Sequence, residues 1–114
     1  MLPDRRRVDR DRRQARRVPA VFAVKNTSGP RVHLGQAEDI GVTGMALRWP
    51  KDAAFPSPVT LTFQLPGSPE PIAACAQVVN ERCAGRYRRT GVRFTALEPH
   101  DAELIARYCA SRKS

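Results

Sequence analysis

The sequence of 114 residues lacks any long apolar run. No stretch approaches the roughly 20 predominantly apolar residues that a membrane-spanning helix needs. The charged N-terminal residues are not followed by the apolar core of a secretory signal. We therefore expect a cytoplasmic protein that does not insert into a membrane.

The residues and motifs on which many enzymes depend are also scarce. The two histidines, His33 and His100, lie far apart in the sequence. No local signature indicates a Cys-His or Ser-His-Asp set, and no Gly-x-x-x-x-Gly-Lys loop is present to cradle a phosphate. No paired acids lie in a setting suited to acid–base catalysis. We expect a protein that is not an enzyme and that needs no cofactor.

Cysteine is limited to three widely spaced residues, Cys75, Cys83 and Cys109. An odd number with this spacing fits neither a disulfide framework nor a zinc site. We therefore expect no metal site, and free thiols that act as small apolar filler.

Aromatic residues make up only 6% of the chain, and lysine is absent from the first 17 residues. The net charge of +9 would allow binding to DNA or RNA, because phosphate contacts dominate such affinity. Stacking of bases, however, needs exposed aromatic side chains, and most of those present fall at core-facing positions of expected strands. A small basic barrel that binds nucleic acid is therefore the less favoured hypothesis. Trp49 either flanks a site or fills the core, and the core is favoured.

The length suits one domain, and its apolar residues alternate with polar ones in several short segments. This alternation predicts strands, with turn residues between them. Neighbouring strands should pair in sequence order, and Ala84-Gly85 lies at a hairpin position. Six such strands favour a small antiparallel barrel, because closure leaves no exposed edge. The predicted strands span residues 18–24, 31–38, 44–49, 59–65, 72–83 and 86–95.

A helix is predicted over residues 99–111. Pro99 suits the first turn, where its missing N–H costs little. Four apolar residues fall on one face at helical spacing, and this face either closes one end of the barrel, which we favour, or meets a second subunit. A monomer and a homodimer both stay open. The four residues are Leu104, Ile105, Tyr108 and Cys109.

The first 17 residues are strongly basic, with eight arginines and three aspartates, a net charge of +5. Residues 1–11 contain too few apolar side chains to order themselves, so we expect a flexible segment there. Residues 12–112 should form a single domain, comprising a barrel over 18–95 and the C-terminal helix. Such a basic arm attracts anions at long range.

Two short stretches stand out as a candidate binding site. Residues 12–17 read Arg-Arg-Gln-Ala-Arg-Arg and supply planar cations. Residues 39–44 read Asp-Ile-Gly-Val-Thr-Gly and supply a carboxylate and two glycines in an expected turn. The glycines would permit positive φ and let a flat ring approach the backbone. A ligand that satisfies both stretches is anionic and carries hydrogen-bond donors, which describes a guanine nucleotide.

These stretches together resemble the PilZ family, the bacterial receptor domains for cyclic di-GMP. The family's Arg-Arg-x-x-x-Arg motif falls on Arg12, Arg13 and Arg17, and its Asp-x-Ser-x-x-Gly motif falls on Asp39, Gly41 and Gly44. A Gly-x-x-Phe motif in the last strand is matched by residues 91–94. The resemblance covers about residues 10 to 110. It implies a six-stranded barrel followed by a helix, with those six residues of the two motifs binding cyclic di-GMP.

Two points in the alignment stay open. Arg12 and Arg16 are also four residues apart and could replace Arg13 and Arg17 as the working pair. Gly41 stands where the family has Ser, so a hydroxyl bond worth about 0.5–1.5 kcal/mol is lost. Because glycine is small and should leave its N–H free, we expect binding that is weakened several-fold.

The resemblance implies a receptor that changes shape on binding cyclic di-GMP and then acts on a partner protein, which the sequence does not identify. Ligand would fasten the arginine segment onto the barrel. The alternative is a PilZ-type adaptor that binds no nucleotide and works in pilus, flagellar or motility machinery. The retained arginines favour the receptor.

Overall fold

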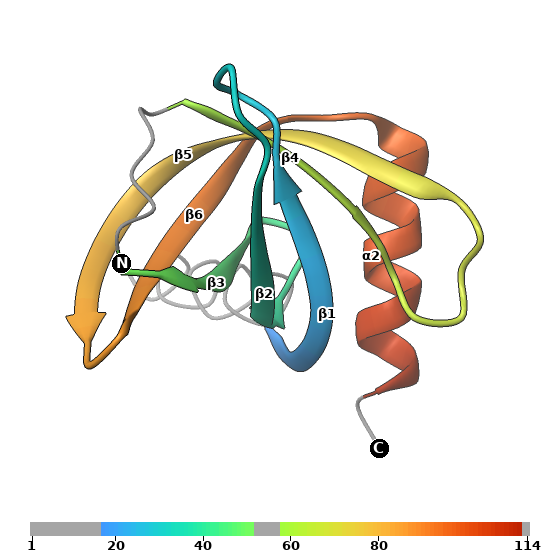
Figure 1. Ribbon diagram of the computed structural model, residues 1–114. Coiled ribbons are helices and arrows are strands. Elements are labelled where there is room, and N and C mark those ends of the chain that lie inside the picture. Colours follow the sequence, from blue (N-terminus) through green and yellow to red (C-terminus); the bar gives the residue numbers. More distant parts are fainter. Residues whose placement is uncertain (1–16, 52–57, 113–114) are drawn as a thin grey trace, which may run out of the picture.

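The computed structural model describes residues 17–51 and 58–112. The expected flexible segment, with Arg12 and Arg13, therefore lies outside the described residues. The described elements, in chain order, are β1 (Val18–Asn26), β2 (His33–Ile40), β3 (Gly44–Pro50), β4 (Val59–Gln64), β5 (Pro71–Ala84), β6 (Tyr87–Leu97) and α2 (Pro99–Ser111) (Figure 1).

The six strands form a closed barrel in the order β1-β2-β3-β6-β5-β4, with all pairs antiparallel. The predicted six-stranded antiparallel barrel with a C-terminal helix is thus confirmed. The expected pairing of every strand with its sequence neighbour was wrong at one point: β3 pairs with β6, and β4 pairs with β1. In this order every strand has two partners, so the closed barrel leaves no exposed edge.

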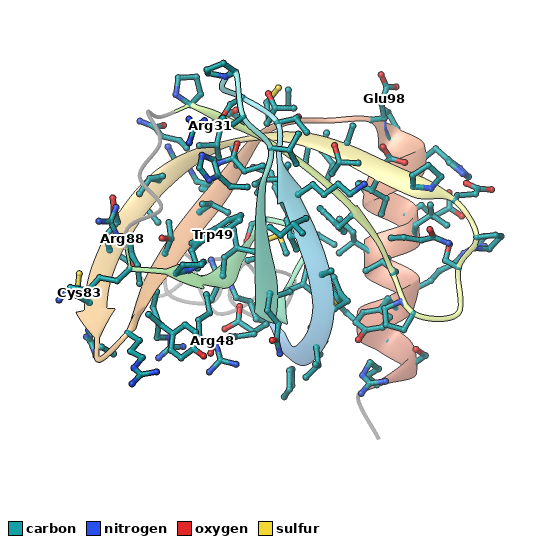
Figure 2. The ribbon with its side chains drawn as sticks, viewed as in Figure 1. Arg31, Arg48, Trp49, Cys83, Arg88 and Glu98 are labelled. Atoms are coloured by element: carbon teal, nitrogen blue, oxygen red, sulfur yellow. The ribbon has the colours of Figure 1, made fainter. Side chains whose placement is uncertain are left out.

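Alternating side chains of the strands fill the barrel. In β4, for example, Val59, Leu61 and Phe63 are buried. Trp49 is fully buried, whereas Arg48 points to the outer face of β3 (Figure 2). The indole fits because Gly35 lacks a side chain: a Cβ there would lie 2.3 Å from Cε3 of Trp49. Trp49 is therefore a core residue, and Gly35 makes room for it.

Helix α2 covers the barrel with the predicted face (Figure 1). Ile105 and Tyr108 are buried, and Leu104 and Cys109 pack against the same core. The ring of Tyr108 meets that of Phe22 edge-on, with the centroids 6.4 Å apart. In the described part of the chain, no helix is long and apolar enough to cross a membrane.

Two smaller expectations were wrong. The β5–β6 hairpin turns at Gly85-Arg86, one residue later than predicted, with Gly85 at a φ of 63° that favours glycine. Cys75 and Cys83 are exposed and do not fill the core, whereas Cys109 is half-buried. Burial raises the pKa of the Cys109 thiol, whose sulfur lies 3.5 Å from the carbonyl oxygen of Ile40.

Candidate functional site

A hollow of about 420 Å³ lies on the outer face of the barrel, over β2, β3, β6 and β5. It brings together residues that are up to 74 positions apart in the chain only because β3 pairs with β6. The side chains that matter most around it are Arg17, Asp39, Ala46, Asn80, Arg82 and Arg89.

The hollow exists because its floor is made of small residues. Ala46 of β3 and Gly91 of β6 are directly paired across the two strands. Gly91 is in turn paired with Asn80 of β5, and a Cβ at Gly91 would lie 2.8 Å from the amide atoms of Asn80. Glycine at this position, part of the predicted Gly-x-x-Phe motif, thus lets the amide lie across the strand. The amide of Asn80 therefore covers Gly91, and Ala46 beside it is the small residue that leaves the hollow open.

Asp39 and Arg17 meet at one end of this floor. Nη1 of Arg17 lies 3.4 Å from Oδ1 of Asp39, and both side chains are about one-third exposed. The same oxygen accepts a hydrogen bond of 3.1 Å from the N–H of Ala46. Among the described residues Oδ2 of Asp39 has no hydrogen-bond partner, so it can accept from a ligand.

The position of Asp39 corrects the expectation that it begins a turn. It lies within β2, and the turn follows at residues 41–43. Ala37 faces the core, so two residues later a regular strand would bury Asp39 as well. A β-bulge between Ala37 and Asp39 in the pairing with β3 inserts Glu38 and turns Asp39 outward, opposite Ala46.

The two glycines of the second motif act differently from the way we predicted. Among the described residues only Gly67 and Gly85 have positive φ, so neither Gly41 nor Gly44 uses that freedom. A Cβ at Gly44 would lie 2.1 Å from the carbonyl oxygen of Val92 and 3.0 Å from Nη2 of Arg17. Gly44 is therefore needed for close approach. The N–H of Gly41 is not free, because it donates to the carbonyl oxygen of Gly44 at 2.9 Å.

The residues on the far side of the hollow were not predicted from the sequence. Asn80 and Arg82 of β5 and Arg89 of β6 line it. The position of the hairpin turn could have predicted these residues, because a turn at Gly85-Arg86 places Arg82 directly opposite Arg89, as observed. The predicted turn one residue earlier would have shifted this register by two residues.

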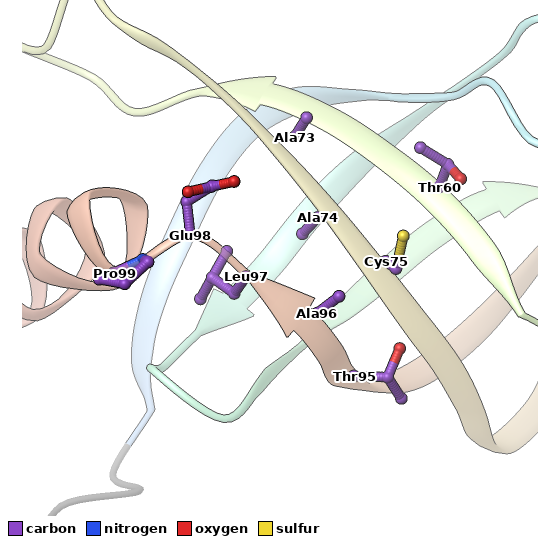
Figure 3. A pocket seen from close by; sticks show the side chains of 9 residues that line it. All are labelled: Thr60, Ala73, Ala74, Cys75, Thr95, Ala96, Leu97, Glu98 and Pro99. Atoms are coloured by element: carbon purple, nitrogen blue, oxygen red, sulfur yellow. The ribbon is translucent and has the colours of Figure 1, made fainter.

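A second cavity of about 560 Å³ lies beside the start of α2 (Figure 3). Thr60, Cys75 and Thr95 approach it from the adjacent strands β4, β5 and β6. Its lining is small and mostly uncharged, with Glu98 as the one charged side chain. Within the described ranges no three metal-ligating side chains come together, here or elsewhere.

The family model for the PilZ domain matches residues 11–111. The chain belongs to the PilZ domain family. The match spans both the arginine motif and the Asp-Gly motif. Of their described residues, Arg17 and Asp39 line the hollow, Gly44 lies close to Arg17, and Gly41 hydrogen-bonds Gly44.

Solved PilZ structures share this fold at low sequence identity. The inhibitor of motility MotI/DgrA from Bacillus subtilis is 19% identical with a TM-score of 0.76, over 85% of this chain and 49% of that one. The PilZ domain of YcgR from Escherichia coli, solved with c-di-GMP, is 16% identical with a TM-score of 0.60, over 90% and 92% of the two chains. PlzA from Borreliella burgdorferi, also solved with c-di-GMP, is 10% identical with a TM-score of 0.65, over 94% and 55%.

The chain thus spans about half the length of MotI/DgrA and of PlzA. Comparison with curated protein sequences finds no match. At these identities the solved structures establish the fold of the domain and leave its ligand to be argued from the site.

Proposed function

We propose that this PilZ domain is a cytoplasmic receptor for cyclic di-GMP and has no catalytic activity of its own. The observation that carries the proposal is the meeting of Arg17 and Asp39 at one hollow, from two motifs 22 residues apart. Two neighbours of this fold, YcgR and PlzA, were solved with that ligand, which supports the same ligand class here.

The chemistry of the hollow suits a guanine dinucleotide. The guanidinium of Arg17 can donate two parallel hydrogen bonds to O6 and N7 of guanine or to a phosphate. Oδ2 of Asp39 can accept from the guanine N1–H and its amino group. The small side chain of Ala46 leaves space for the ring, beside the Asn80 amide that covers Gly91. Arg12 and Arg13 are proposed as further ligand-binding arginines, and Gly41 and Gly44 as the backbone beside the ligand.

The absence of the family's Ser at position 41 should weaken ligand binding. Because the N–H of Gly41 is already used within the turn, that group does not replace the missing hydroxyl. We therefore propose binding that is several-fold weaker than a serine at this position would give.

The proposed signal arises when the ligand orders the arginine segment. In this proposal the bound dinucleotide fastens the arginine segment to the barrel, and the altered surface is read by a partner protein. The ligand can drive such a change only by the difference in its contacts with the two states. The neighbour MotI/DgrA, an inhibitor of motility, makes regulation of motility one output to test.

The decisive experiment is isothermal titration of the purified protein with cyclic di-GMP at physiological salt, with GTP and cyclic di-AMP as controls. The proposal predicts saturable binding in the low micromolar range or tighter, and only for the guanine dinucleotide. If no heat is released and competition with a labelled ligand also fails, the receptor function is wrong. The chain would then be a PilZ-type adaptor that acts through protein contacts.

A further inference from the structure

Three arginines form a continuous row on the outer face of the barrel. Arg48 of β3 is directly paired with Arg89 of β6, and Arg89 is directly paired with Arg82 of β5. Directly paired residues project from the same face of a sheet, with Cβ atoms about 4.5–5.5 Å apart, and like charges in such positions destabilise it. Such a row is destabilising unless negatively charged groups lie beside it.

The barrel itself supplies only part of that countercharge. Glu38, the bulge residue of β2, lies 2.6 Å from Nε of Arg89 and 3.7 Å from Nε of Arg48. The Oε1 atom that faces Arg89 is buried and accepts no well-aligned hydrogen bond within the described residues, so this contact is an ion pair. One carboxylate thus pairs with two of the three arginines. In the part of the chain that the structure describes, Arg82 pairs with no carboxylate.

The unmatched positive charge lies at the hollow. Arg48 stacks over the ring of Tyr87, 4.9 Å from its centroid, and does not line the hollow. Arg82 and Arg89 do line it, across from Asp39. Glu81 lines it as well, but its carboxylate is paired with Arg88. Because Glu38 contacts Arg89 at Nε, the two terminal nitrogens of that guanidinium remain as a fork of donors. A planar fork of this kind binds phosphate oxygens in two parallel contacts.

We propose that Arg82 and Arg89 form a second anion-binding arm that holds a phosphate of the cyclic dinucleotide, opposite the Arg17 and Asp39 end of the hollow. The inference rests on the proposed function, since it assigns one part of the same ligand. It adds two binding residues that neither sequence motif contains. It also accounts for the row, because the ligand brings the negative charge that the barrel lacks.

The test compares Arg89→Ala with Arg31→Ala by isothermal titration with cyclic di-GMP. Arg31 is a matched control, because it is exposed, follows the other end of β1 and lies outside the hollow. Both variants lose one positive charge. Arg88 does not serve as the control, because its ion-pair partner Glu81 lines the hollow. We expect the Arg89→Ala dissociation constant to rise about tenfold or more, as for one charge-assisted hydrogen bond, and the Arg31→Ala value to stay within about twofold of the parent.

Two further variants refine the result. Arg82→Ala breaks no ion pair among the described residues, so it provides the same test should Arg89→Ala unfold, and we expect a similar loss. Arg89→Lys keeps the charge and loses the fork, and its affinity should fall between those of the parent and Arg89→Ala.

The outcomes separate the two proposals. If the parent protein binds and the Arg89→Ala and Arg82→Ala proteins bind as tightly, the second arm is wrong and the receptor function stands. Equal weakening in Arg31→Ala would also overturn the arm, because it would show an effect of net charge alone. If the parent itself does not bind, the receptor function fails, and the assignment of the arm fails with it.

Discussion

Replacing Arg17 with alanine should remove ligand binding and leave the fold almost unchanged. The side chain makes one loose ion pair in the ligand-free protein, 3.4 Å from Asp39, and both partners are about one-third exposed. Pairs of this kind contribute about 0–1 kcal/mol. The free energy of unfolding should therefore fall by less than about 1 kcal/mol, which corresponds to a melting temperature lowered by no more than a few degrees.

The expected cost to binding is much larger. If Arg17 clamps the dinucleotide with two charge-assisted hydrogen bonds of about 1.5–3 kcal/mol each, their loss raises the dissociation constant about 100-fold or more. The assay is isothermal titration with cyclic di-GMP, accompanied by a thermal unfolding curve of the same sample. Arg31→Ala is the matched control, because that exposed arginine follows the other end of β1 and lies outside the hollow.

Two results would refute the reasoning. An Arg17→Ala protein that binds as tightly as the parent would show that the hollow is not the site, or that Arg12 and Arg16 form the working pair. A protein that melts far below the parent would show that Arg17 is mainly structural. Equal loss of binding in Arg31→Ala would attribute the effect to overall charge.

Two further predictions concern stability and titration. Gly35→Ala should lower the free energy of unfolding by about 1–3 kcal/mol or more, because the new Cβ would meet the buried ring of Trp49. The control is Gly29→Ala, which has open space around it and should change that free energy by no more than about 1 kcal/mol in denaturant unfolding. Equal effects of the two substitutions would contradict this account. Glu70 hydrogen-bonds His100 and raises its pKa. The pair therefore stabilises the fold in mildly acidic solution, where the imidazole is protonated and the carboxylate is ionised, and the benefit disappears as pH rises through the raised pKa. Glu70→Gln should lower that pKa in an NMR titration, and an unchanged value would exclude the contact.

Much of the fold could be predicted from local patterns. Alternation of apolar and polar residues follows from the period of a strand, and it located all six strands to within a few residues. Helix α2 was predicted over its full length, because Pro99 at its start and the spacing of its apolar face are local features. The candidate site residues Arg17, Asp39 and Gly44 were proposed in the same way, from motifs that are short and contiguous, and the structure brings them close together.

Register was harder to predict. The hairpin between β5 and β6 was placed one residue too early, and that error alone conceals the pairing of Arg82 with Arg89. Hairpin register depends on the turn, and both Ala84-Gly85 and Gly85-Arg86 offer a glycine. The choice depends on packing along the whole of the two strands, which no short window of sequence contains.

The sequence by itself determined that this chain forms a mainly β domain with a C-terminal helix, and it marked arginines and an aspartate as a candidate binding site. Only the tertiary structure decided where these groups point. The bulge at Glu38 turns Asp39 from the core to the surface, and the pairing of β3 with β6 brings Ala46 beside Gly91 to form the floor. Both depend on contacts between strands far apart in the chain, because a strand's outward face is defined only by the partners that cover its other face.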